Sequence, residues 1–229
     1  MASINTKKRL NDLIYKSRLN LLDMLKDRGF DTKHLRNYTQ DTLILSLEKH
    51  EQGKFNNSPE ISPLDIFLEH PKTGDKLYVK YRLDDKFKNT AGFKKLVYSI
   101  YETQKLKEKD CLIVLVVNRI LIKPNNKSNP LYNFIEDFRL QKKYIQIFGL
   151  ENFLINISKY QLVPKHKKLN ETEVKEVCER YHITKDNLPK IMSQDPMAKY
   201  IGLRVGDIVK ISGYNPITGI NISYSICIP

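Results

Sequence analysis

Residues 180–211 read RYHITKDNLPKIMSQDPMAKYIGLRVGDIVKI, and this stretch carries the strongest structural signals of the 229-residue chain. Within it, Asp195-Pro196 has the chemistry of a helix N-cap followed by proline at the first helical position. Gly202 suits the left-handed residue that ends a helix. Residues 184–192 are interpreted as a further short helix with Pro189 in its first turn, where a missing backbone N–H is harmless. The stretch therefore predicts two short helices.

Beyond this stretch, apolar and polar residues alternate, which is the period of a half-buried strand. The strand is expected to pair with residues 207–212 and to close a β-hairpin packed on three short helices. The residues predicted to share its buried face are Ile220, Ile222, Tyr224 and Ile226.

Upstream of residue 180, Asn170 and Glu173 have the spacing of a capping box, which predicts another short helix. The residues expected in its buried stripe are Val174, Val177, Cys178 and Tyr181. Residues 159–164 resemble a connector. We therefore expect a larger N-terminal domain over residues 1–158 and a small C-terminal domain over residues 159–229.

The N-terminal domain is expected to alternate helices and strands, which predicts a mixed α/β or α+β fold class. The expected helices are residues 6–28, ended by Gly29, residues 39–52, residues 92–105 and one that starts at Asn129-Pro130. The expected strands are residues 64–69, 77–83, 111–117 and 144–148, with residues 152–158 also extended. The first two strands should form a hairpin, and a polar loop should cover residues 53–60.

The charge of the chain indicates an anionic partner. The formal net charge is +13 and the pI is about 9.5, so nucleic acid is the first candidate, because lysine and arginine neutralise phosphates. Most of the excess is N-terminal: residues 1–159 hold 29 basic and 19 acidic residues, whereas residues 160–229 hold 10 and 7.

Membranes, metals and cofactors find no support in the sequence. No apolar run approaches the roughly 20 residues of a membrane span and no signal-peptide pattern opens the chain. The three separated cysteines indicate buried thiols in a reducing compartment. The chain lacks paired metal-ligand spacings and phosphate-loop glycines. We therefore expect a soluble, intracellular protein with no metal, no cofactor and no small-molecule substrate.

A metal-dependent nuclease is the main enzymatic alternative, because a basic α/β domain with a hairpin can host such a site. The site needs a carboxylate two positions before a strand lysine, and here Tyr78-Val79-Lys80 has a phenol instead. Mg²⁺ would lose an anionic oxygen ligand. Neither Asp65 nor Asp75 alone can replace that arrangement, so the sequence argues against nuclease activity.

A DNA-contacting surface is expected on two lysine groups. One surrounds the start of the helix at residues 92–105, where the helix dipole also favours phosphate, and the other lies in a loop near residue 125. The alternative for each is an ordinary solvated lysine. The DNA-proximal candidates are Lys86, Lys88, Lys94, Lys95, Lys123 and Lys127.

The C-terminal domain is better suited to docking than to reading DNA. A helix-turn-helix interpretation fails because Glu171, Glu176 and Glu179 on the first helix would repel phosphate. The open edge of a short sheet instead invites another chain to pair or pack.

Six short blocks of the C-terminal stretch carry a family resemblance. They are Leu162-Val163-Pro164-Lys165-His166, Arg180-Tyr181, Leu188-Pro189-Lys190-Ile191, Asp195-Pro196, Tyr200-Ile201-Gly202-Leu203 and Gly206-Asp207-Ile208-Val209-Lys210-Ile211. Their order and spacing resemble the common, fifth subunit of eukaryotic-type DNA-directed RNA polymerases, whose C-terminal domain has a counterpart in the archaeal enzyme. The subunit-docking residues that the resemblance implies are Pro164, His166, Leu188, Pro189, Asp195, Pro196, Tyr200, Gly202, Gly206 and Lys210.

The N-terminal domain resembles the jaw domain of that family more faintly, through residues 25–29 (LKDRG) and the succession of elements. The resemblance implies an endonuclease-like topology without an active site, located in the lower jaw near downstream duplex DNA. It also implies that the C-terminal domain docks on the largest polymerase subunit, among other polymerase subunits. The chain would then be a non-catalytic structural part in transcription, and catalysis would belong to other subunits.

The last hairpin departs from the family pattern. Gly213 and residues 215–217 replace a typical arginine and Ser-Glu-Thr, and Ile220 and Ser225 replace basic positions. This drift and the Asn/Lys/Ile-rich composition make a large DNA virus a candidate source beside a divergent eukaryote. The expected location is the nucleus for a cellular protein, and the virion or a cytoplasmic viral factory for a viral one. The alternative function is a free-standing basic DNA-binding transcription protein.

Overall fold

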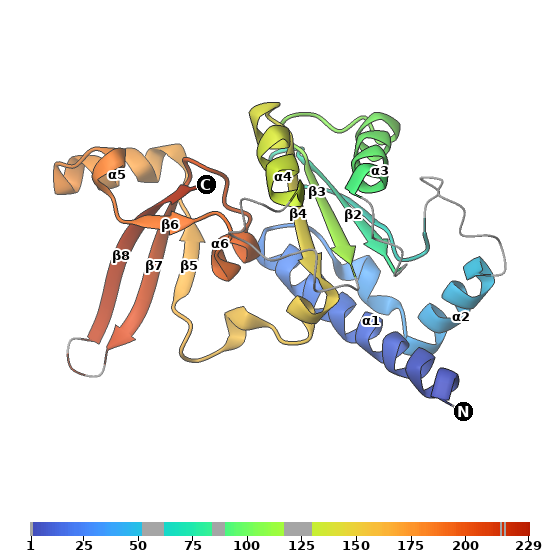
Figure 1. The fold of residues 1–229 in the computed structure, drawn as a ribbon. Helices are drawn as coiled ribbons and strands as arrows, with labels where there is room; N and C mark the ends of the chain where they lie inside the picture. Colours follow the sequence, from blue (N-terminus) through green and yellow to red (C-terminus); the bar gives the residue numbers. More distant parts are fainter. Residues whose placement is uncertain (1, 52–61, 84–89, 117–129, 216, 218) are drawn as a thin grey trace. The chain divides into compact units, whose positions relative to one another are not determined.

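The computed structural model describes residues 2–51, 62–83, 90–116, 130–215, 217 and 219–229. The chain divides into two compact units, Met1–Ile155 and Asn156–Pro229, and each is built on its own four-stranded sheet (Figure 1). The expected fold class, mixed α+β, is confirmed. The expected loop at residues 53–60 lies outside the described residues.

The sheet of the first unit has the strand order β1-β2-β3-β4. Its strands are β1 (Ile66–Glu69), β2 (Lys76–Arg82), β3 (Cys111–Val116) and β4 (Tyr144–Gly149). The first two form the predicted antiparallel hairpin, whereas β2, β3 and β4 run parallel. All six residues of β3 are buried, as expected for the centre of a parallel sheet.

Helices cover both faces of this sheet. Two of them, α3 (Thr90–Thr103) and α4 (Pro130–Leu140), connect the parallel strands and pack on one face, and α1 (Ala2–Asp27) crosses the other (Figure 1). The unit also contains η1 (Lys33–Asn37) and α2 (Gln40–Glu51). Across the described ranges, no helix is long and apolar enough to cross a membrane.

The sheet of the second unit has the order β5-β7-β8-β6. Its long central hairpin is β7 (Ile208–Asn215) and β8 (Gly219–Ile228), and short strands β5 (Lys165–Lys168) and β6 (Lys190–Met192) flank it. The two helices, α5 (Glu171–Tyr181) and α6 (Pro196–Ile201), pack on separate apolar clusters. The predicted hairpin is confirmed.

Capping residues begin or end three helices where the sequence predicts. Asn170 and Glu173 form the capping box of α5, and the Asp195 carboxylate accepts the first N–H groups of α6. Gly202 ends α6 in the left-handed conformation. Gly29 follows α1 with φ +95°, and the N–H of Phe30 donates to the carbonyl of Leu25 over 3.0 Å.

The prediction of a helix at residues 184–192 is wrong. A single 3-10 turn, η5 (Lys185–Asn187), is followed by strand β6. Proline disfavours helical geometry in the residue before it, and Leu188 is extended at ψ 147°. The carbonyl of Pro189 then accepts the N–H of Ile226, so the segment joins the sheet. The C-terminal unit consequently has two helices on its hairpin, not three.

The predicted buried faces of α5 and β8 are only partly correct. Tyr224 and Ile226 pack on the α5 cluster, but Ile220 and Ile222 are exposed because α5 does not extend over that half of the hairpin. Cys227, on the opposite face, is buried under α6. Tyr181 was expected in the core and is 50% exposed, with its ring against that of Tyr224.

The extended segment expected at residues 152–158 is also wrong. Two 3-10 turns lie there, η3 (Leu150–Phe153) and η4 (Ile157–Lys159). Asparagine side chains stabilise these turns. Oδ1 of Asn152 accepts the N–H of Gly149, and Oδ1 of Asn156 accepts the N–H of Ser158. Such local bonds compete with extended structure.

Substituting Gly29→Ala should destabilise the protein. A Cβ there would lie 2.7 Å from Nε2 of His70, and φ +95° is costly for any residue with a side chain. We expect a loss of about 2 kcal/mol or more in urea unfolding. Gly92→Ala is the control: it lies in α3 with open space around its Cβ, so stability should stay equal or rise by up to about 1 kcal/mol. Equal effects of both substitutions would contradict this account.

Candidate functional site

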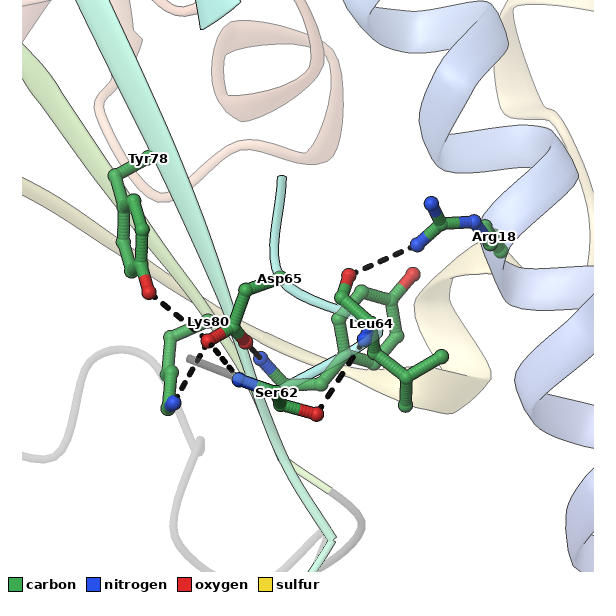
Figure 2. Close-up of polar contacts among 7 residues, drawn as sticks. Arg18, Ser62, Leu64, Asp65, Tyr78 and Lys80 are labelled. Atoms are coloured by element: carbon green, nitrogen blue, oxygen red, sulfur yellow. Dashed lines mark hydrogen bonds and ion pairs between the residues drawn. The ribbon is translucent and has the colours of Figure 1, made fainter. Parts of the chain in front are cut away.

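A cluster of polar side chains lies inside the first unit, around the carboxylate of Asp65 (Figure 2). Oδ2 of Asp65 accepts hydrogen bonds from the Tyr78 hydroxyl at 2.9 Å and from Nζ of Lys80 at 2.7 Å. It also accepts the N–H of Ser62 at 2.9 Å, and the N–H of Tyr81 is 3.3 Å from Oδ1. Four donors thus converge on one carboxylate.

Local structure explains why these groups meet. Tyr78 and Lys80 are two residues apart on β2, so their side chains share one face. Asp65 comes just before β1, which pairs with β2 from Ile66 onward. A turn holds Asp65, because its own N–H donates to the carbonyl of Ser62 over 2.9 Å. The hairpin therefore delivers the carboxylate to the strand lysine.

The cluster is nearly closed to solvent. The side chains of Asp65 and Lys80 are 1% and 9% exposed, so their ion pair lies in a poorly solvated environment. Burial raises the pKa of Tyr78 above its ordinary value, and the negative charge of Asp65 raises it further. Tyr78 is therefore a neutral hydrogen-bond donor at neutral pH, and the carboxylate is held by neutral and cationic donors.

This geometry does not suit metal-dependent cleavage. A hard cation needs several free anionic oxygens, but the donors around Asp65 occupy its lone pairs, and Tyr78 stands where a second carboxylate would be needed. In the described part of the chain, no three His, Cys, Asp or Glu side chains gather in a way that could hold a metal ion. Sequence analysis did not predict that Asp65 pairs with Tyr78 and Lys80. The two-residue spacing of Tyr78 and Lys80 on one strand could have indicated that their side chains share a face.

The structure describes two of the six lysines that were predicted to contact DNA, Lys94 and Lys95. Strands β2 and β3 end at Arg82 and Val116, which are register partners, and the helices α3 and α4 follow these strands. Lys94 and Lys95 lie in the second turn of α3, because the helix begins at Thr90 and not at residue 92 as expected, so the helix dipole adds little at these lysines. The other candidates, Lys86, Lys88, Lys123 and Lys127, fall outside the described residues.

Aromatic rings hold two lysines of this unit, which the sequence did not indicate. Nζ of Lys94 lies 5.3 Å from the ring centroid of Phe134. Nζ of Lys143 is 5.3 Å from the centroid of Tyr98 and similarly close to two further rings, those of Tyr101 and Phe138. Both lysines are half-buried, and the cation–π contacts hold their ammonium groups against the rings.

The predicted docking residues mostly support the fold of the second unit. Leu188 and Tyr200 are buried, and Asp195-Pro196 and Gly202 begin and end α6. Gly206 turns with φ +93° and donates its N–H to the carbonyl of Cys227.

The remaining predicted docking residues lie on or beside the sheet. Pro189 bonds β8 through its carbonyl, and Nδ1 of His166, on β5, is 2.8 Å from the carbonyl oxygen of Pro164. Lys210 is half-buried on β7. Their contact with another subunit stays a prediction.

The comparison with known proteins identifies relatives of both units. Residues 155–227 match the family model described as RNA polymerase Rpb5, C-terminal domain. The chain is 23% identical over 210 residues to subunit 5B of DNA-directed RNA polymerases IV and V from Arabidopsis thaliana. The aligned residues are 92% of this chain and 87% of the relative. It is 24% identical to subunit 5A of DNA-directed RNA polymerase V from the same plant, over 92% of this chain and 86% of the relative.

Breaking the buried ion pair should unfold the first unit more easily. Asp65→Asn removes the carboxylate that pairs with the Lys80 ammonium, and removing one partner of a buried pair costs about 3–5 kcal/mol. Urea unfolding followed by circular dichroism measures the loss. Asp75→Asn is the matched control, because that carboxylate accepts a bond from the exposed Thr73 hydroxyl and should matter by only about 0.5 kcal/mol. A loss below about 1 kcal/mol for Asp65→Asn would contradict the pairing.

Proposed function

We propose that the chain is a member of the fifth-subunit family of DNA-directed RNA polymerases and serves as a structural, non-catalytic subunit of a multisubunit enzyme. One observation carries the proposal: similarity to two polymerase subunits runs through 92% of the chain, and the family match covers nearly all of the second unit. Its role in transcription would be to hold other parts of the enzyme and the template in position.

The second unit is proposed to dock on the largest polymerase subunit and to secure assembly. Its support is the match of residues 155–227 and the compact fold that those residues build. The acidic outer residues of α5 also argue against DNA as its partner, since Glu171, Glu176 and Glu179 would repel phosphate.

The first unit is proposed to form part of the lower jaw, beside downstream duplex DNA. Its support is the positive excess of residues 1–159 and the presence of Lys94 and the exposed Lys95 on α3. Lysine contacts to the DNA phosphates position a protein on the duplex without reading the base sequence.

Catalysis is proposed to belong to other subunits of the enzyme. The support is the state of the Asp65 carboxylate, which internal donors already occupy. The proposed location follows the polymerase: the nucleus for a cellular protein, or a virion or cytoplasmic viral factory for a viral one.

Affinity purification of the tagged chain from its native source tests the proposal. We expect both large polymerase subunits in fixed stoichiometry and RNA synthesis on a promoter-independent template. A lone, monomeric protein with salt-dependent DNA affinity would instead support the free-standing DNA-binding alternative, which the net charge of +13 keeps relevant.

Deleting the second unit, residues 156–229, should abolish incorporation into the polymerase. The remaining unit holds its own sheet and apolar core, so it should still fold, which circular dichroism would check. Mass spectrometry of the purified tagged protein measures incorporation. Recovery of the large subunits at the level of the full chain would refute the docking role of this unit.

Reversing two charges in the first unit should weaken DNA contact without affecting assembly. Lys94→Glu combined with Lys95→Glu should lower the affinity of the polymerase for downstream duplex DNA, and the slope of log affinity against log salt should fall by up to about 2. Lys175→Glu with Lys185→Glu, both exposed in the second unit, is the control and should change neither. Equal DNA binding by both double variants would contradict the proposed jaw surface.

A further inference from the structure

The hairpin of the second unit leaves one edge of its sheet open. Strand β6 pairs with β8 only through Ile226–Ile228, so the segment Gly219–Tyr224 of β8 has no strand on its outer side among the described residues. We call Gly219–Tyr224 the open edge. On its inner side the same segment pairs with β7 in a continuous antiparallel register, from Tyr224 opposite Lys210 to Gly219 opposite Asn215.

The hydrogen bonds of β8 show which backbone groups point outward. The N–H of Ile226 donates to the carbonyl of Pro189 on the β6 side over 2.8 Å, whereas the N–H of Cys227 donates to the carbonyl of Asp207 on the β7 side. This direction alternates along a strand. The N–H and C=O groups of Ile220, Ile222 and Tyr224 therefore point out of the sheet.

On one face of the open edge the side chains are apolar and largely solvent-exposed, whereas Asn221 and Ser223 are exposed on the other face. Ile220 is 76% exposed and Ile222 is 45% exposed, and Tyr214, directly opposite Ile220 on β7, is 78% exposed. Residues 211–229 contain no charged side chain, in a chain of which 28% is charged. Soluble proteins usually protect an edge of this kind with lysine, proline or a bulge.

From these features we propose that the open edge receives an extended, uncharged segment of another polymerase subunit as an added strand. The inference rests on the function proposed above and specifies how the second unit docks. Outward N–H and C=O groups at every second residue match the spacing of another strand, and β6 already makes such a pairing with the next residues of β8. Apolar residues at alternate positions of the segment would cover Ile220 and Ile222.

A second copy of this chain fits the open edge less well. Each copy carries a net charge of +13, so two copies repel. The edge is also short: six residues span about 20 Å, and pairing over that length falls well below the roughly 1,200 Å² of a stable specific interface.

Proline at position 222 tests the open edge without breaking the hairpin. Ile222→Pro removes an outward N–H and leaves the bonds between β7 and β8 in place, whereas Ser223→Pro removes an N–H that points toward β7 and should unfold the hairpin. We expect the full-length I222P chain to be folded and monomeric, and to recover at least about tenfold less of the two large subunits than wild type. Ile222→Lys, which adds an edge charge, should act in the same direction.

Hydrogen exchange supplies an independent readout. In the polymerase complex, the amides of Ile220, Ile222 and Tyr224 should exchange at least about tenfold more slowly than in the free chain, because an added strand accepts their hydrogen bonds. Unchanged exchange at these amides, or equal recovery of the large subunits by I222P, overturns the inference and leaves the polymerase role intact. A wild-type dimer that I222P converts to monomers also overturns it, in favour of self-pairing. Failure of the wild-type chain to recover any polymerase subunit overturns both proposals.

Discussion

The first unit depends on one buried interaction, the ion pair between Asp65 and Lys80. Strand β2 lies between α1 on one face of the sheet and α3 and α4 on the other, so a lysine in this strand needs a counter-charge inside the protein. Asp65 supplies it from the turn that precedes β1. The pair thereby links the turn that precedes β1 to strand β2, and it leaves the Asp65 carboxylate engaged by donors within the protein.

In the second unit, the residues that build the core and the exposed apolar residues lie on different halves of the β7–β8 hairpin. Its two apolar clusters lie on the C-terminal half of β8, where α5 and α6 cover both faces. The other half of the hairpin carries exposed isoleucines and outward backbone groups. Most blocks that resemble the polymerase subunit family coincide with caps, turns and buried positions, such as Asp195, Gly202 and Leu188. The residues that carry the resemblance therefore mainly stabilise the fold. We expect the surface that contacts the partner subunit to consist mainly of other residues.

Sequence reasoning succeeded where the signal is local and failed where it depends on neighbours. The hairpin at residues 66–82, the buried strand β3 and the caps at Asn170 and Asp195 were all predictable, because periodicity and capping chemistry are written in adjacent residues. Strands β5 and β6 were missed, since three- and four-residue edge strands have no period of their own. The burial of Ile220 and Ile222 was predicted wrongly, because alternation shows which residues share a face but not whether a helix covers it.

The sequence by itself determined the four strands and the main helices of the first unit, the caps of α5 and α6, the family resemblance and the absence of a carboxylate at position 78. These properties depend on residue type and spacing along the chain, which local sterics and hydrogen bonding translate directly into structure. Tertiary structure alone decided that Asp65 meets Tyr78 and Lys80, that aromatic rings hold Lys94 and Lys143, and that the edge of β8 stays open. Each of these results from segments that are distant in sequence and that only packing brings together or leaves apart.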